Sequence, residues 1–278
     1  MTGRAQVDGI TVFKRIVTIA GGAGVIAGVL LTLVQLFAVT DLIQQAEVYE
    51  ARAGEATSLP ALPRTEGLST APDAHAHVAG EAAQPHEHPA SGLVADASTP
   101  SSRGRRVFLT GVANVTLAIG FGLLLCAAMH LRGKVTGWRS GVLWGLAGYI
   151  VFFVAPSLGL PPELPGTAAA PLAQRQHWWL EAVVASGIGL SLLCFAPRWY
   201  GKLAGLVSLL APHLLGAPHL QNAASAAPAQ IADAFVGATA LANAVMWISL
   251  GTLVGVFYCK SFVSRPLSDT LAAPVHVA

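Results

Sequence analysis

Six apolar segments, each close to the length of a transmembrane helix, limit the fold of this chain more than any other feature of its sequence. A helix needs about 20 apolar residues to cross the ~30 Å hydrocarbon core of a bilayer. The candidate segments are 15–38, 107–131, 139–158, 178–196, 201–216 and 233–258. They show no alternation of polar and apolar residues that would indicate barrel strands. We therefore predict an all-α integral membrane protein, a bundle of about six transmembrane helices; five remain an alternative because the fifth segment is short.

The composition agrees with a membrane protein, since 54% of the residues are hydrophobic, only 11% are charged and the mean hydropathy is +0.60. These values lie far outside the range of soluble globular proteins. One stretch differs, because it is rich in Pro, Ser, Thr, Ala, Gly and His and buries too little apolar surface to fold. We predict a cytoplasmic N-terminus at 1–14, a first helix with an outer extension at 15–51, a disordered outer loop at 52–106, the remaining membrane bundle at 107–258 and a cytoplasmic tail at 259–278.

The distribution of charge predicts the orientation, because Lys and Arg accumulate on the cytoplasmic side of a membrane. A six-span arrangement with both ends inside places ten basic and two acidic residues in the cytoplasm. The outer face then holds twelve acidic and six basic residues, an excess that concentrates cations. We predict a multi-pass protein of the bacterial inner membrane. Arg103, Arg105 and Arg106 are an exception, since they adjoin the second span on the outer side.

Two His-x-His pairs lie in the predicted outer loop: His75 with His77, and His86 with His88. Each pair offers two imidazole nitrogens on a short tether, and imidazole is a ligand that cobalt, nickel, copper and zinc prefer. We expect these four histidines to bind divalent metal weakly and exchangeably. The alternative is accidental composition in an unconstrained loop.

Four further clusters of acidic and histidine residues are expected at the outer ends of helices, where they could line one vestibule. Ionisable groups at membrane depth are costly and mark transport pathways, although a boundary residue can simply be solvated. The candidate metal ligands in these clusters are Glu47, Glu50, Glu163, His177, His213 and His219, and Glu181 and Asp233 lie beside them. We expect Glu47 and Glu50 to share a helical face if the first helix continues beyond the bilayer.

Pairs of glycines spaced four residues apart occur in several of the apolar segments. Small residues at this spacing allow membrane helices to pack backbone against backbone. The pairs are Gly24/Gly28, Gly141/Gly145, Gly201/Gly205 and Gly251/Gly255. They predict a compact bundle, although a chain with 29 glycines produces some such spacings by chance.

Several stretches of the chain together resemble the cobalt transporter subunit CbtA family. The resemblance is carried by Ala46–Glu50, Trp144–Gly148, Ala155–Gly166, Arg175–Trp179, Pro212–His219 and Ala234–Phe235. It covers nearly the whole chain except the polar loop and the tails. The resemblance implies a membrane permease for cobalt that serves cobalamin biosynthesis and works with a small single-span, His-rich subunit, CbtB. It also supports the six candidate ligands outside the loop.

No Walker A pattern or glycine-rich phosphate loop is present, so we expect no nucleotide hydrolysis by this chain. We predict a permease subunit that takes up Co²⁺, with Ni²⁺ as an alternative substrate, and captures the ion with outer histidines and carboxylates. We expect no permanently bound cofactor, no nucleic-acid partner and no enzymatic activity. Two alternatives stay open: a non-transporting metal sensor or scaffold, and a membrane metalloenzyme. The enzyme is disfavoured because the sequence lacks a tight His-Glu-x-x-His type of cluster.

Overall fold

The computed structural model of this chain describes residues 2–58, 100–133, 135, 137–220 and 225–263, and this part is helical apart from its connecting turns. The elements in chain order are α1 (Thr2–Ala38), α2 (Thr40–Ser58), α4 (Pro100–Arg132), α5 (Trp138–Tyr149), η1 (Ile150–Val154), α6 (Ala155–Gly159), α7 (Leu172–Phe195), α8 (Trp199–Leu215), α9 (Ala229–Tyr258) and η2 (Cys259–Val263). The helices α2 and α4 reach into both ends of the stretch predicted as a loop. The four loop histidines lie outside the described residues.

Five helical segments are long and apolar enough to cross a membrane, which confirms the prediction of an all-α membrane bundle. They are Gly9–Ala38, Arg103–Arg132, Trp138–Gly159, Leu172–Phe195 and Ala229–Phe262. The fifth predicted segment, 201–216, forms α8, which has 17 residues. At 1.5 Å per residue it is about 25 Å long, somewhat less than the hydrocarbon core of a bilayer.

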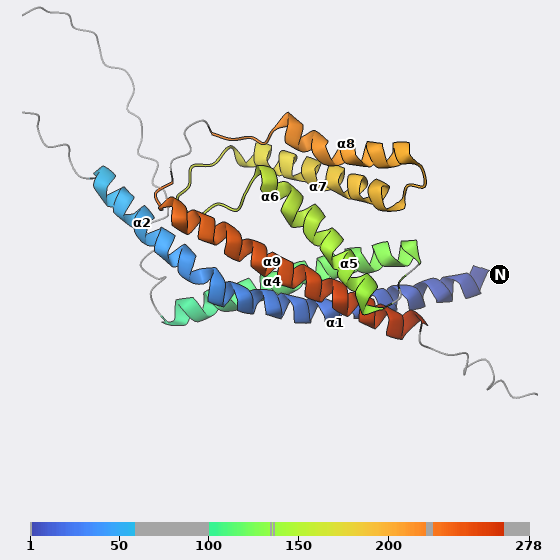
Figure 1. Cartoon of the computed structure of the whole chain (residues 1–278). Coiled ribbons are helices and arrows are strands. Elements are labelled where there is room, and N and C mark those ends of the chain that lie inside the picture. The colour runs from blue at the N-terminus through green and yellow to red at the C-terminus, as the bar shows by residue number, and fades with distance from the viewer. Residues whose placement is uncertain (1, 59–99, 134, 136, 221–224, 264–278) are drawn as a thin grey trace, which may run out of the picture.

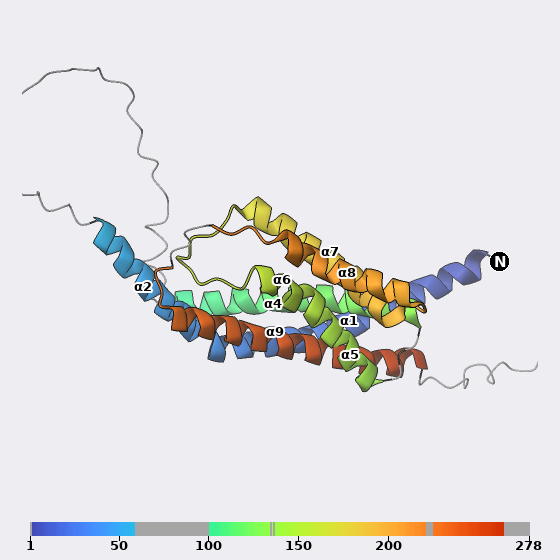
Figure 2. The same ribbon diagram turned by 45° about the horizontal axis from the view of Figure 1, so that its top comes forward.

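The helix α8 nevertheless reverses the direction of the chain, as the six-span prediction requires. Figures 1 and 2 show α7 and α8 side by side as an antiparallel hairpin, so α9 starts at the end of the bundle where α7 starts. The guanidinium of Arg15 in α1 donates a hydrogen bond to the carbonyl of Ser261, at 3.1 Å. The first part of α1 and the last turn after α9 therefore lie at the same end.

The core of the bundle is formed by α1, α4, α5 and α9. Trp247 of α9 is 1% exposed and stacks on Phe152 of η1, with ring centroids 5.4 Å apart. Met129 of α4 and Ala27 of α1 are fully buried in the same cluster. The α7–α8 hairpin packs mainly on itself and joins the core through η1 and α6. It forms a second layer beside the core (Figure 2).

Glycines set the closest helix contacts, as their spacing predicts. A Cβ added at Gly251 of α9 would lie 2.6 Å from the Cα of Gly145 in α5, and one added at Gly24 of α1 would lie 2.6 Å from the Cα of Ile119 in α4. The pair Gly201/Gly205 behaves differently. Gly205 packs against the backbone of Gly189 in α7, whereas Gly201 lies in the first turn of α8 and faces only Ala196 of the preceding turn.

A π-helical turn interrupts the third span and places the turn that follows it. The N–H of Ala155 donates to the carbonyl of Ile150, five residues earlier. Pro156 follows directly and has no N–H to continue the ordinary α-helical ladder, which accounts for a π turn at this point. The helix ends at Gly159, and Pro161 and Pro162 then lead the chain across the end of the bundle.

Candidate functional site

All four predicted clusters lie at one end of the bundle, which we call the α2 end because α2 extends from it (Figure 1). A small apolar cluster joins α2, the turn 160–171 and the start of α9. Its buried members are Val39, Ala46, Leu164, Ala227 and Phe235. An isolated β-bridge between Thr167 and Ser225 ties the turn to the segment before α9. The sequence prediction that these stretches gather on one face is therefore confirmed in the geometry of the chain.

The carboxylates of α2 share one helix, as predicted, but contact different neighbours. The helix runs on from α1 almost without a break, since Ile43 N–H donates to the carbonyl of Val39 at 3.2 Å. Glu47 lies 3.7 Å from the guanidinium of Arg106 in α4, with both side chains about half exposed. The side chain of Glu50 instead lies over Gly166, whose φ of +76° suits only glycine. These two carboxylates do not face a common point.

Glu163 forms an ion pair that joins the proline-rich turn to the start of α7. Its carboxylate lies 2.9 Å from Nη2 of Arg175, and the two side chains are 29% and 32% exposed. The Nε of Arg175 is buried without a hydrogen-bond partner in the described part of the chain. Sequence reasoning missed this pair. The available signal was the placement of opposite charges on either side of a turn that reverses the chain.

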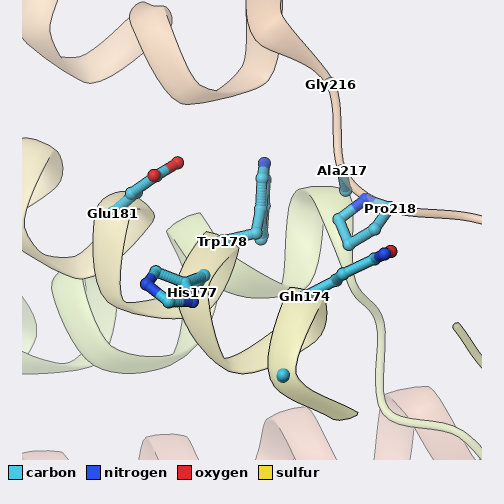
Figure 3. A pocket seen from close by; sticks show the side chains of 8 residues that line it. Gln174, His177, Trp178, Glu181, Gly216, Ala217 and Pro218 are labelled. Atoms are coloured by element: carbon cyan, nitrogen blue, oxygen red, sulfur yellow. The ribbon is translucent and has the colours of Figure 1, made fainter. Parts of the chain in front are cut away.

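A surface pocket of about 470 Å³ lies between α7 and the segment that follows α8. Gln174, His177, Trp178 and Glu181 line it from α7, and residues 216–218 line it from the other side. Figure 3 shows His177 and Glu181 on successive turns, to one side of Trp178, while Gln174 lies on the other side next to Pro218. The pocket thus offers one imidazole and one carboxylate as metal ligands.

Trp178 links three of the four clusters. Its side chain is almost fully buried, in contrast to Trp179, which is 40% exposed. The indole ring covers Gly159, where any side chain would collide with it. The ring of His213 stands edge-on to the indole, with centroids 5.9 Å apart. The indole N–H is buried and has no hydrogen-bond partner among the described residues.

The remaining candidates lie at the same end without joining a common site. His219 is exposed in the segment after α8, and Asp233 is exposed near the start of α9. His75, His77, His86 and His88 are outside the described residues. Within the described part, no group of three or more His, Cys, Asp or Glu side chains is close enough to hold a metal ion. A metal ion in the pocket would therefore take two protein ligands and complete its coordination with water.

The opposite end of the bundle is basic and aromatic. The guanidinium of Arg132 lies 4.7 Å from the ring centroid of Phe195, and that of Arg15 lies 5.5 Å from Phe262. His130, near the end of α4, has its Nδ1 at 3.0 Å from the hydroxyl of Tyr258. The helix directions place the described basic residues of the predicted cytoplasmic side at this end. The described acidic residues from Asp41 onward lie at the α2 end.

Comparison with known proteins adds to this geometry. No curated protein and no solved structure matches the chain. The CbtA family, described as a probable cobalt transporter subunit, matches residues 13–259. The match includes most or all of each spanning helix and the four clusters of the α2 end. The chain therefore belongs to the CbtA family of cobalt transporter subunits.

Proposed function

We propose that this chain imports divalent cobalt across the bacterial inner membrane, with the α2 end outside and its pocket on α7 as the binding site at which the ion enters the helical bundle. Family membership indicates a cobalt transporter subunit, and five helices are able to span a membrane. The separation of charge supports the direction, because the basic end is retained in the cytoplasm. The acidic α2 end then attracts cations from outside.

The pair His177 and Glu181 carries the proposed capture step. The two residues are four apart on one face of α7, and both side chains are exposed at the pocket. Imidazole and carboxylate suit Co²⁺, and they accept Ni²⁺ as readily, so selectivity between these ions has to come from geometry or supply. Two protein ligands hold the ion weakly enough to release it, which transport requires.

The other predicted ligands assist this site. Glu47 and Glu163 hold α2 and the proline-rich turn in place through their arginine pairs, Glu50 adds negative charge at the α2 end, and His213 and His219 flank the segment that lines the pocket opposite α7. The histidines of the loop, at 75, 77, 86 and 88, collect the ion earlier. We propose CbtB, with its own His-rich tail, as the partner subunit. No catalytic role and no resident cofactor is part of this proposal.

The membrane potential is a sufficient source of energy for this import. Moving one elementary charge inward through 100 mV is worth about 2.3 kcal/mol, so a divalent ion gains about 4.6 kcal/mol. An inside-negative potential therefore drives accumulation without nucleotide hydrolysis. A coupled proton is compatible with the same route.

Radiocobalt uptake tests the proposal in cells that lack other cobalt importers and express the full chain with its partner subunit. His177→Ala combined with Glu181→Gln should lower the initial rate at least about tenfold at subsaturating cobalt, the cost of losing one charged ligand interaction of about 1.4 kcal/mol or more. Gln176→Ala is the matched control, because Gln176 is exposed on α7 and does not line the pocket.

Two results would overturn the proposal. If the double variant takes up cobalt as fast as Gln176→Ala at equal protein level, the pocket is not part of the transport pathway. If cells that express the wild-type chain take up no more cobalt than cells without it, the chain does not transport cobalt. Metal binding without flux would then identify a sensor or scaffold. Competition by Ni²⁺ in the same assay measures the selectivity.

A further inference from the structure

A second cavity, of about 370 Å³, lies in the face of the bundle between α1 and α4 and within the spanning segments. It is lined by Val29, Thr32, Leu33, Phe108, Gly111, Val112, Val115 and Thr116. We call it the α1–α4 groove. It is separate from the pocket on α7 and shares no residue with it.

The α1–α4 groove presents an apolar surface although two threonines line it. The hydroxyl of Thr32 donates to the carbonyl of Gly28 at 2.8 Å, and that of Thr116 donates to the carbonyl of Val112 at 2.9 Å. Both hydroxyl protons are thus used within their own helices. The large side chain of Phe108 is 67% exposed beside them. A groove of this kind is suited to a hydrocarbon chain.

Three arginines lie near the start of α4, where the helix enters the membrane, and one of them lies on the same face of α4 as the groove. Arg105 precedes Phe108 by three residues and Val112 by seven, so it lies on the groove face of α4. Arg103 lies about 140° round the helix from Phe108, at 3.6 residues per turn. Arg106 is paired with Glu47. Arg103 and Arg105 are exposed and have no ion pair among the described residues.

We propose that the α1–α4 groove and Arg105 form a binding site for an anionic phospholipid. The guanidinium takes the phosphate through paired hydrogen bonds, a geometry that arginine matches well. One acyl chain then lies in the groove. From Arg105 to Val115 the helix rises about 15 Å, which is half the hydrocarbon thickness and the depth of one leaflet.

This site accounts for a feature that the transport proposal leaves unexplained. Arg103, Arg105 and Arg106 form a basic group at the otherwise acidic α2 end, against the expected distribution of charge. A bound anionic headgroup balances this charge locally. The inference stands whichever ion the chain transports and in whichever direction.

Native mass spectrometry of the detergent-purified full chain, incubated with equal amounts of phosphatidylglycerol and phosphatidylcholine, tests the site. Arg105→Gln should lower retention of phosphatidylglycerol about tenfold, because it removes a charge-assisted contact. Arg103→Gln makes the same change of charge on another face of α4 and should retain the lipid. The wild-type chain should retain phosphatidylglycerol in preference to phosphatidylcholine.

A second pair of variants tests the groove without changing charge. A Cβ at Gly111 would meet the side chain of Thr32 at an ordinary 3.8 Å, so Gly111→Leu extends into the groove without a backbone clash. A Cβ at Gly120, on the same helix, would have nothing within 4 Å. Gly111→Leu should therefore lose the lipid about as fully as Arg105→Gln does, and Gly120→Leu should keep it.

Four results would overturn the inference. If Gly111→Leu and Gly120→Leu retain phosphatidylglycerol equally, the lipid does not bind in the groove. If Arg105→Gln and Arg103→Gln lose it equally, only the net charge of the chain matters and Arg105 has no specific role. Equal retention of phosphatidylglycerol and phosphatidylcholine by the wild-type chain excludes an anionic lipid. A stoichiometric polypeptide found in place of lipid would assign the groove to a partner helix instead.

Discussion

Replacement of Gly251 by alanine tests the packing of α5 against α9, on which the shape of the bundle depends. The added Cβ would lie 2.6 Å from both the Cα and the N of Gly145, whereas real Cβ atoms essentially never approach another heavy atom within 3.0 Å. Those neighbours are backbone atoms and cannot rotate away. The only relief is a separation of the two helices.

The size of the effect follows from the contact distance. Carbon atoms pack best at about 3.5–4.0 Å, so α5 and α9 must separate by about 1 Å at this point. Overpacking of this kind costs about 1–3 kcal/mol. Gly237 lies on the same helix, and a Cβ there would have nothing within 4 Å. Gly237→Ala should therefore stabilise the helix by about 0.5–1 kcal/mol, and the two variants should differ by about 1.5–4 kcal/mol.

Unfolding of both variants by titration with sodium dodecyl sulfate in mixed micelles measures this difference, since each variant carries the same change from glycine to alanine. Gly251→Ala should unfold at a lower detergent fraction than the wild-type chain, and Gly237→Ala at an equal or higher fraction. The two curves would coincide if the glycines of α9 owed their positions to chance. That outcome would refute the reasoning from close backbone contact.

Three further outcomes are expected. Asn114→Leu removes an amide that donates to two α1 side chains, at 3.1 and 2.7 Å, and should destabilise the chain by about 0.5–1.5 kcal/mol in the same titration. Glu163→Gln should lower the free energy of unfolding by about 1 kcal/mol, and adding Arg175→Gln should cost less than the sum of the two single changes, since the pair is lost only once. In a background without native cysteines, His219→Cys should react in intact cells with a membrane-impermeant thiol reagent, and Lys202→Cys only after permeabilisation. Equal reactivity of these two positions would place both ends of α8 on the same side of the membrane.

The helical spans could be predicted from the sequence because hydrophobic length is a local property. Segments of about 20 apolar residues identified the five spanning helices, and the spacing of glycines identified Gly145 and Gly251 as contact positions. The sequence did not predict which helices pack against each other. Gly205 packs on Gly189 rather than acting with Gly201, because a four-residue spacing shows which face is small but not which helix meets it.

The candidate site could be predicted only as a set of helix ends. Alternation of helix direction was enough to bring Glu163, His177 and His213 to one end of the bundle. The sequence did not reveal that Trp178 is the buried residue between them, since its neighbour Trp179 is identical in type and only the rotation of α7 separates their environments. It also did not reveal the ion pairs of Glu47 and Glu163, which depend on how α2 packs beside α4 and on how the proline-rich turn folds back onto α7.

These ion pairs bear on how an ion would pass the α2 end. Glu47 and Glu163 each have an arginine as counter-ion, at 3.7 and 2.9 Å, so a divalent cation must compete with a guanidinium for either carboxylate. Glu181 has no such partner in the described part of the chain and adjoins His177 at the pocket. On the proposed route the ion would meet one carboxylate without a counter-ion at the pocket, with an imidazole four residues away, while the paired carboxylates would keep the turn and α2 in position. This division of roles is why we expect substitutions at His177 and Glu181 to change uptake, and substitutions at Glu163 to change stability first.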